Sequence, residues 1–342
     1  MTEASAILRR AIVVDGCQFT EGDFPGLDRL AARDILTAIN LTLPDSQAGF
    51  AATARAAGRL WRRVAGPEGA RLTIATRAGD IRHAKADGTL ALVFALQHPD
   101  AVDHDLDQLW ALGTLGVRVI QLAYNEASYI GGGAIEDVDC GLTRFGRQAV
   151  AEMNRAGITI DLSHCGDRTC LDAAAVSTRP VLLTHANPRR RAPNPRNKPD
   201  EVLKAVAASG GVVGVSPWGP ICWRGPKNPR PTLDDYLGHV EYLVELLGID
   251  HVSFGADSPV AGTPDVAGIK EQADRYAPVV EAYNREIGPT FAVRYPEGLF
   301  GAAGLPAVVS GLLGRGFKDT DIEKFLGLNL LRAFDATWRQ GG

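Results

Sequence analysis

The chain has 342 residues, of which 45% are hydrophobic and 22% charged, proportions typical of a globular protein with a large core. Its net charge of −4 gives no electrostatic reason to expect nucleic acid or an anionic membrane as a partner. No signal-peptide pattern and no apolar stretch of about 20 residues is visible. Five cysteines, an odd number at irregular spacings, suit a reducing compartment. We therefore expect a cytoplasmic protein that binds neither nucleic acid nor membrane.

Short aliphatic runs alternate with helical patterns along most of the chain. Near-continuous apolar strands alternating with helices indicate a parallel sheet covered by helices, and eight such strands can close a barrel. We predict one (β/α)8 TIM-barrel domain over residues 1–342, with an open doubly wound sheet as the alternative. The predicted strands are Ala11–Val14, Ala38–Thr42, Leu90–Leu96, Val117–Leu122, Ile158–Leu162, Val181–Thr184, Gly211–Val215 and Val252–Gly255. The predicted helices include Leu106–Leu115, Arg144–Ala156, Thr169–Val176, Asp200–Ala208 and Leu233–Leu247.

Two segments in the last third of the chain have predicted roles outside the barrel strands. Residues 263–299 are poorly patterned, so we expect an insertion or lid at about residues 260–300, over the top face of the barrel. The end of the chain, Asp319–Phe334, has the pattern of a helix that packs on the barrel.

Two histidines each end a predicted buried strand. His164 follows the run that begins at Ile158, and His185 follows the run that begins at Val181. Because (β/α) barrels gather their catalytic groups at the carboxyl ends of strands, these imidazoles are expected to lie close together. Neutral imidazole is a ligand that suits zinc, and a catalytic zinc keeps an open position for water. Either histidine alone would more often be structural, but the pair predicts a metal site.

Asp257 comes directly after the eighth predicted strand, in a Gly-Ala-Asp sequence. A carboxylate at that position is suited to general-base catalysis or to binding a metal. Capping of a loop is the structural alternative for this residue.

Motifs along nearly the whole chain resemble the membrane dipeptidase (renal dipeptidase, peptidase M19) family of the amidohydrolase superfamily. Their order and spacing hold across nearly the whole chain, and together they are far more specific than any one alone. The motifs are Gly141–Gly146, Met153–Gly157, Asp161–His164, Thr184–Asn187, Arg196–Asp200, Gly255–Asp257 and Gly327–Arg332.

This resemblance implies a (β/α)8 barrel in which two zinc ions activate water to attack a dipeptide amide. The family's two histidine ligands fall on His164 and His185, and its acid–base aspartate falls on Asp257. The arginine that holds the substrate carboxylate falls on Arg196, and a guanidinium suits that task. The position after the fourth strand that is His in many members is Tyr124 here. Its phenol would contact the substrate and donate to a developing oxyanion.

The chain departs from the family pattern at three metal-ligand positions. The family expects Asp-Gly-His-x-Asp after the first strand, and Asp15–Phe19 reads Asp-Gly-Cys-Gln-Phe. Cys17 can bind zinc as a thiolate, but Phe19 cannot bind a metal. Gln97 replaces the bridging glutamate after the family's third strand, and a neutral amide is a poor bridge between two dications.

One half of the two-metal site is therefore expected to be dismantled. We predict at most one zinc ion, held by His164 and His185 with help from Cys17, Gln97 or Asp257. Two imidazoles without an anionic partner would bind zinc weakly, so Cys17 or Asp257 decides whether any metal stays bound.

These expectations favour a dipeptidase-like metal-dependent hydrolase that cleaves a dipeptide or small amide. The alternative is a divergent barrel enzyme, with one metal or none, that performs a different tailoring reaction on a small carboxylate-bearing metabolite. A non-enzymatic binding protein built on the same barrel is a third hypothesis. The family resemblance also suggests a homodimer.

Overall fold

The structure, a computed structural model, describes residues 2–20, 22, 24–44, 48–260 and 276–338. Its strands are β1 (Val14–Phe19), β2 (Ala38–Thr42), β3 (Leu72–Ile74), β4 (Leu90–Leu96), β5 (Val117–Gln121), β6 (Thr159–Asp161), β7 (Val181–Leu183), β8 (Val212–Val215), β9 (Val252–Phe254) and β10 (Ser258–Pro259). Its α-helices are α1 (Glu3–Arg10), α2 (Leu27–Ala32), α3 (Phe50–Ala65), α4 (Ala78–Asp87), α5 (Asp107–Leu115), α6 (Arg144–Ala156), α7 (Asp167–Val176), α8 (Asp200–Ala208), α9 (Gly219–Cys222), α10 (Leu233–Leu247), α12 (Ala277–Glu286), α13 (Leu305–Gly314), α14 (Asp319–Glu323) and α15 (Asn329–Thr337). Single helical turns are η2 (Pro67–Gly69), η3 (Asp100–Val102), η4 (Ile249–His251), η5 (Phe291–Val293), η6 (Gly301–Gly304) and the π-helix η7 (Lys324–Leu328).

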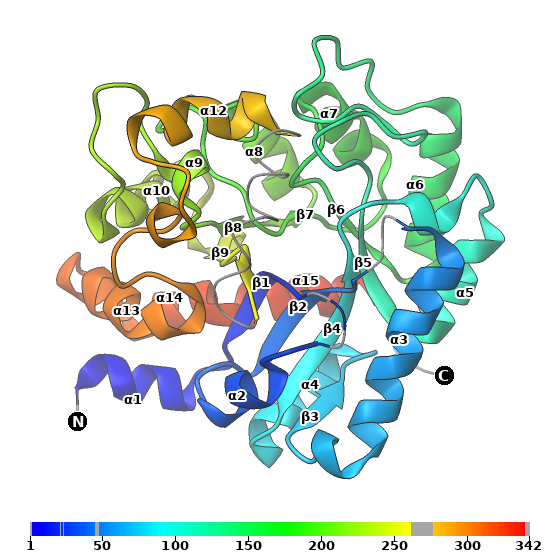
Figure 1. Ribbon diagram of the computed structural model, residues 1–342, viewed down its shortest axis with the longest axis horizontal. Coiled ribbons are helices and arrows are strands. Elements are labelled where there is room, and N and C mark those ends of the chain that lie inside the picture. The colour runs from blue at the N-terminus through cyan, green and yellow to red at the C-terminus, as the bar shows by residue number, and fades with distance from the viewer. Residues whose placement is uncertain (1, 21, 23, 45–47, 261–275, 339–342) are drawn as a thin grey trace.

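The strands form one curled parallel sheet in the order β10-β1-β2-β4-β5-β6-β7-β8-β9, with β3 beside β4 (Figure 1). The sheet closes because the segment from Val252 to Pro259 pairs with β8 at its start and with β1 at its end. The helices surround this sheet, as Figure 1 shows. The predicted (β/α)8 barrel is therefore confirmed.

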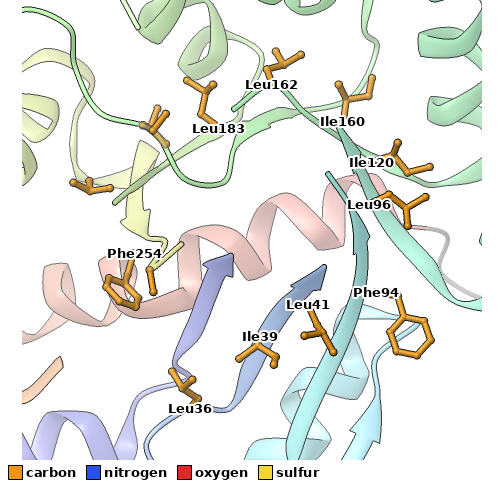
Figure 2. Packing of buried hydrophobic residues seen from close by; sticks show 14 of the residues in the cluster. Leu36, Ile39, Leu41, Phe94, Leu96, Ile120, Ile160, Leu162, Leu183 and Phe254 are labelled. Carbon is orange, nitrogen blue, oxygen red and sulfur yellow. The ribbon is translucent and has the colours of Figure 1, made fainter. Parts of the chain in front are cut away.

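Successive residues of β4 face two different parts of the core. Leu90, Leu92, Phe94 and Leu96 pack in the large cluster that joins the sheet to its surrounding helices, and Figure 2 shows Phe94 and Leu96 among these residues. The residues between them pack in a second cluster with side chains of α15. Because a strand alternates its side chains between two faces, both faces of β4 are buried, which explains its unbroken apolar sequence.

The first predicted strand, Ala11–Val14, is wrong, because β1 begins at Val14 and runs on to Phe19. The prediction followed the aliphatic residues, whereas the strand continues through the polar and buried residues Asp15 and Gln18. Their burial is compensated by hydrogen bonds within β1 and from the backbone of Ala256, just after β9. β3 and β10 were not predicted, since runs of three and two residues carry no periodic signal.

Helix termini follow local capping signals. Helix α6 begins after Thr143, whose hydroxyl accepts from the backbone N–H of Gly146, and it ends at Gly157 in a left-handed conformation. Helix α10 begins after Thr232 with a reciprocal capping box. The predicted bounds of α6, α8 and α10 are confirmed, while the expected helix Asp319–Phe334 is divided into α14, η7 and α15.

The segment expected as an insertion lies partly outside the described residues, at 261–275. Its described remainder contains α12, which packs beside α9 (Figure 1). The Tyr276 ring, just before α12, lies edge-on to Tyr124 with ring centroids 5.3 Å apart. A lid function for this segment stays a prediction. No helix among the described residues is long and apolar enough to cross a membrane.

Candidate active site

His164 and His185 converge at the carboxyl ends of β6 and β7. Their Nε2 atoms lie 2.9 Å apart, and both side chains are buried. β6 and β7 are neighbouring parallel strands, so residues that follow them at equivalent places meet at the same edge of the sheet. The predicted convergence of the two imidazoles is present in the structure.

The outer nitrogen of each imidazole has its own partner. His164 Nδ1 lies 2.7 Å from Asn125 Oδ1, and His185 Nδ1 lies 2.8 Å from Thr184 Oγ1. Thr184 Oγ1 in turn donates to Asp161 over 2.6 Å. With its only proton directed to the carboxylate, the Thr184 hydroxyl accepts from His185 Nδ1–H. Both outer nitrogens therefore carry protons, and both inner Nε2 atoms present lone pairs.

Two facing lone pairs repel each other unless a cation lies near them, and this arrangement fits a metal ion. Burial, reinforced by Arg196, lowers the pKa of both His164 and His185, so the imidazoles are neutral. Imidazole nitrogens on a tetrahedral zinc are about 3.3 Å apart, given zinc–nitrogen distances of about 2.0–2.1 Å. The 2.9 Å separation therefore needs to open by only a few tenths of an ångström.

Replacing Thr184 with Val is expected to weaken zinc binding about 10- to 100-fold, because His185 loses the partner that fixes its tautomer. Zinc affinity is measured by competition with a chromophoric chelator. Thr184→Ser keeps the hydroxyl and is expected to bind zinc as the wild type does. An unchanged affinity in a folded Thr184→Val protein would show that the hydroxyl does not orient His185.

The backbone around Thr184 is held by close contacts with neighbouring strand ends. A Cβ atom on Gly16 would lie 2.4 Å from the Thr184 carbonyl oxygen, and one on Gly255 would lie 2.0 Å from it. Only glycine permits this approach, so any side chain at these two positions would displace the strand end that carries His185.

A thiol and a carboxylate complete the cluster around His185. The ligand atoms of Cys17, His185 and Asp257 all lie within 4.8 Å of one another. Cys17 is only 1% exposed, and burial together with the nearby Asp257 raises the pKa of its thiol. Imidazole, thiolate and carboxylate are all zinc ligands, so the cluster fits one such ion.

Asp257 lies where the barrel seam closes. Its backbone N–H donates to the Cys17 carbonyl over 2.9 Å, and its φ of +50° is left-handed. Aspartate and asparagine adopt this conformation more readily than most residues. Burial raises the pKa of Asp257 to about 6, and the nearby Arg196 opposes this shift. Its carboxyl can therefore exchange a proton near neutral pH.

Gln97 reaches Cys17 as a hydrogen-bond donor. Its Nε2 atom lies 3.4 Å from Cys17 Sγ and 2.7 Å from Thr42 Oγ1. With this amide orientation, the atom of Gln97 nearest to Cys17 cannot bind a cation. Only its carbonyl oxygen remains available for the ligand role predicted from the sequence.

Arg196 contacts the loops that carry His164 and His185 and is 1% exposed. Its guanidinium donates to the backbone carbonyl oxygens of Ser163 and His185. Its Nε atom has no hydrogen-bond partner among the described residues. The side chain therefore links the ends of β6 and β7 through hydrogen bonds. Its remaining N–H groups, including Nε–H, are available to a substrate.

Tyr124 covers the outer face of His164. The two rings are stacked, with centroids 4.1 Å apart. Burial raises the pKa of Tyr124, so its hydroxyl stays protonated and can donate a hydrogen bond. The predicted roles of Tyr124 and Arg196 toward a substrate remain predictions.

Asp15 is a site residue to which the sequence analysis assigned no role. It is fully buried and accepts from the backbone N–H groups of Cys17 and Ala256 and from Gln18 Nε2. These bonds join the end of β1 to the segment that carries Asp257. Burial raises the pKa of Asp15 to about 7.

The raised pKa of Asp15 makes the metal-free protein less stable as pH rises. Between about pH 4 and about pH 7 the unfolded chain releases this proton while the folded chain retains it, so the free energy of unfolding falls. Each unit of pKa difference corresponds to about 1.4 kcal/mol. Denaturant unfolding of chelator-treated protein at about pH 5 and about pH 8 measures the effect.

Asp15→Asn is the matched variant for this measurement. Its carbonyl can still accept from Cys17 and Ala256, and its amide can donate to Gln18 Oε1, which has no partner among the described residues. We expect the stability of the variant to depend less on pH than that of the wild type. Equal pH dependence in the two proteins would contradict the assignment.

Asn125, Thr184 and Asp161 also had no predicted role in the site. Asp161 accepts four hydrogen bonds, two from Ser163 and two from Thr184. The position of Asp161 three residues before His164 was the only available signal. Nothing in the sequence indicated Asn125, which lies 39 residues before its partner His164.

The fold and the cluster of imidazole, thiol and carboxylate at its strand ends define an amidohydrolase-like (β/α)8 barrel. A family model described as membrane dipeptidase (peptidase family M19) matches residues 53–286. The chain belongs to this family, which confirms the resemblance seen in its motifs. Peptidases of family M19 are metal-dependent hydrolases, so the predicted enzyme class is also confirmed.

Relatives and a solved structure agree with this membership. The chain is 29% identical over 278 residues to an uncharacterized protein in the pqqA 5′ region of Klebsiella pneumoniae, covering 79% of this chain and 90% of that one. It is 27% identical over 265 residues to dipeptidase tcpJ of Claviceps purpurea, covering 77% of this chain but only 54% of the fungal protein. An amidohydrolase structure from Pseudomonas aeruginosa superposes with a TM-score of 0.85 at 29% identity, covering 98% of this chain and 99% of that one.

Proposed function

We propose that this chain hydrolyses the amide bond of a dipeptide, or of another small amide that carries a carboxylate, with the help of one zinc ion. The observation that carries the proposal is the 2.9 Å approach of His164 Nε2 and His185 Nε2 beside Cys17 and Asp257. His164 and His185 would hold the ion, with an anionic partner from Cys17 or Asp257. A bound zinc supplies Lewis acidity and lowers the pKa of water.

Residues of the chain supply the remaining functions in this proposal. Asp257 accepts the proton of the attacking water and returns it to the leaving amine, which suits a carboxyl whose pKa is raised to about 6. The protonated hydroxyl of Tyr124 donates to the oxygen that gains negative charge. The unused N–H groups of Arg196 bind the substrate carboxylate.

The alternative is a different reaction on the same barrel, and one observation favours it. Gln97 stands where the family resemblance expects the bridging glutamate, and its neutral amide donates to Cys17 instead of offering an anionic ligand. A site that bound no metal would use Asp257 and Tyr124 for acid–base chemistry on a small carboxylate-bearing metabolite.

Metal analysis and a substrate screen together test the proposal. We expect about one zinc per chain in protein purified without chelators, and turnover of at least one member of a dipeptide panel that includes D-residues at the C-terminal position. Absence of zinc would favour the alternative reaction. Absence of any dipeptide hydrolysis, with or without added zinc, would overturn the proposal.

A further inference from the structure

The contact between Cys17 and Gln97 bears on which anionic group would hold the metal. Cys17 Sγ accepts from Gln97 Nε2 over 3.4 Å, and Thr42 Oγ1 holds the same nitrogen at 2.7 Å. The hydrogen bond to Thr42 thus fixes the Gln97 amide with its Nε2 atom facing the Cys17 sulfur. An N–H donor aimed at a sulfur stabilises the negative charge of a thiolate. The amide nitrogen that donates does not itself bind the metal.

The sulfur also lies within reach of His185, whose Nε2 atom is 2.9 Å from His164 Nε2. Cys17 Sγ, a ring nitrogen of His185 and a carboxylate oxygen of Asp257 are mutually within 4.8 Å. Ligands around a tetrahedral zinc are about 3.3–3.8 Å apart, given zinc–sulfur distances of about 2.3 Å and zinc–nitrogen distances of about 2.0 Å. Small side-chain rotations therefore bring Cys17 and His185 onto one ion.

The hydrogen-bond donor at its sulfur distinguishes Cys17 from Asp257 as the anionic ligand. His164 and His185 are neutral, so one anionic ligand is needed to hold a dication firmly. Arg196 interacts electrostatically with both groups, more strongly with Asp257 than with Cys17, whereas Gln97 Nε2 donates to Cys17 Sγ. A thiolate ligand leaves Asp257 free for proton transfer, whereas a carboxylate ligand would remove that group from the reaction.

We propose that Cys17, which loses its thiol proton when the ion binds, is the anionic ligand of a single metal ion shared with His185 and His164, and that Gln97 supports its sulfur as a hydrogen-bond donor. The proposal rests on the metal-dependent function proposed above and deepens it. A thiolate ligand gives the site a preference for thiophilic ions such as zinc and cobalt over magnesium and manganese. It also gives Gln97 a positioning role in place of the ligand role predicted from the sequence.

Cobalt binding tests this assignment without measuring activity. Full-length protein freed of metal by a chelator is titrated with Co²⁺ while its near-ultraviolet absorbance is recorded. We expect about one ion per chain and a sulfur-to-cobalt charge-transfer band that an excess of Mg²⁺ or Mn²⁺ does not remove. Cys17→Ser should lose the band, while Cys222→Ser, a matched change at another buried cysteine, should keep it.

Gln97→Leu tests the donor and keeps the proposal falsifiable if Cys17→Ser fails to fold. We expect this variant to shift the band and to weaken cobalt binding about 10- to 100-fold. An unchanged band and affinity in Gln97→Leu would overturn the role of Gln97. Cobalt uptake without a charge-transfer band would overturn the Cys17 assignment but leave the proposed function standing. No cobalt uptake by the wild type would overturn both.

Discussion

Asp257→Asn is expected to reduce kcat/KM for a dipeptide substrate about 100- to 10,000-fold, the range that positioned general acid–base groups contribute. An amide cannot accept and return the proton that the proposed reaction moves. Asparagine also adopts the left-handed conformation found at this position, where φ is +50°, so the fold should be retained. Steady-state kinetics of both proteins, with thermal unfolding as the control for folding, measures the effect.

The pH profile separates a proton-transfer role from a structural one. Asp257 acts as a base only when ionised, and burial raises its pKa to about 6. Activity of the wild type should therefore rise with pH through the acidic range, and this limb should disappear in Asp257→Asn. An Asn variant that keeps more than about a tenth of the wild-type activity would exclude Asp257 as the general base.

Arg196→Met is expected to lower the free energy of unfolding by about 2–4 kcal/mol, because two buried carbonyl oxygens lose their donors at once. Methionine fills much of the same volume without placing a charge in the core. Since the two carbonyls belong to Ser163 and His185, the loops that carry both imidazoles should also loosen. Denaturant unfolding and zinc affinity, measured on the same samples, report these two effects.

Arg196→Lys is the control for this experiment. Lysine retains the positive charge but cannot donate to two carbonyls in the planar arrangement of a guanidinium. We expect an intermediate stability and a weakened zinc affinity in the Lys variant. If Arg196→Met matches the wild type in stability and zinc binding, the guanidinium does not hold the histidine loops together.

Most of the barrel could be predicted because its signals are local. Strand β4 is an unbroken apolar run, and helices α6 and α10 begin and end at capping residues next to them in sequence. Such features depend on neighbours a few residues away. Their ends were therefore predicted to within a few residues.

The barrel seam could not be predicted in the same way. Strand β1 contains Asp15 and Gln18, which interrupt its apolar pattern. Their burial is possible because Asp15 accepts from the backbone of Ala256, which is 241 residues away along the chain. No local pattern carries such a contact, and for this reason the first strand was placed too early.

By itself, the sequence determined the family, the barrel and the position of His164 and His185 at neighbouring strand ends, because these depend on motif order and on short-range periodicity. Only the tertiary structure decided what surrounds them. Asn125 and Thr184 contact the outer nitrogens, and Gln97 faces the Cys17 sulfur as a donor. The Asn125 and Gln97 contacts join segments that are far apart in sequence. The direction of all three contacts, including that of Thr184 with the adjacent His185, is set by packing, which residue type and spacing do not encode.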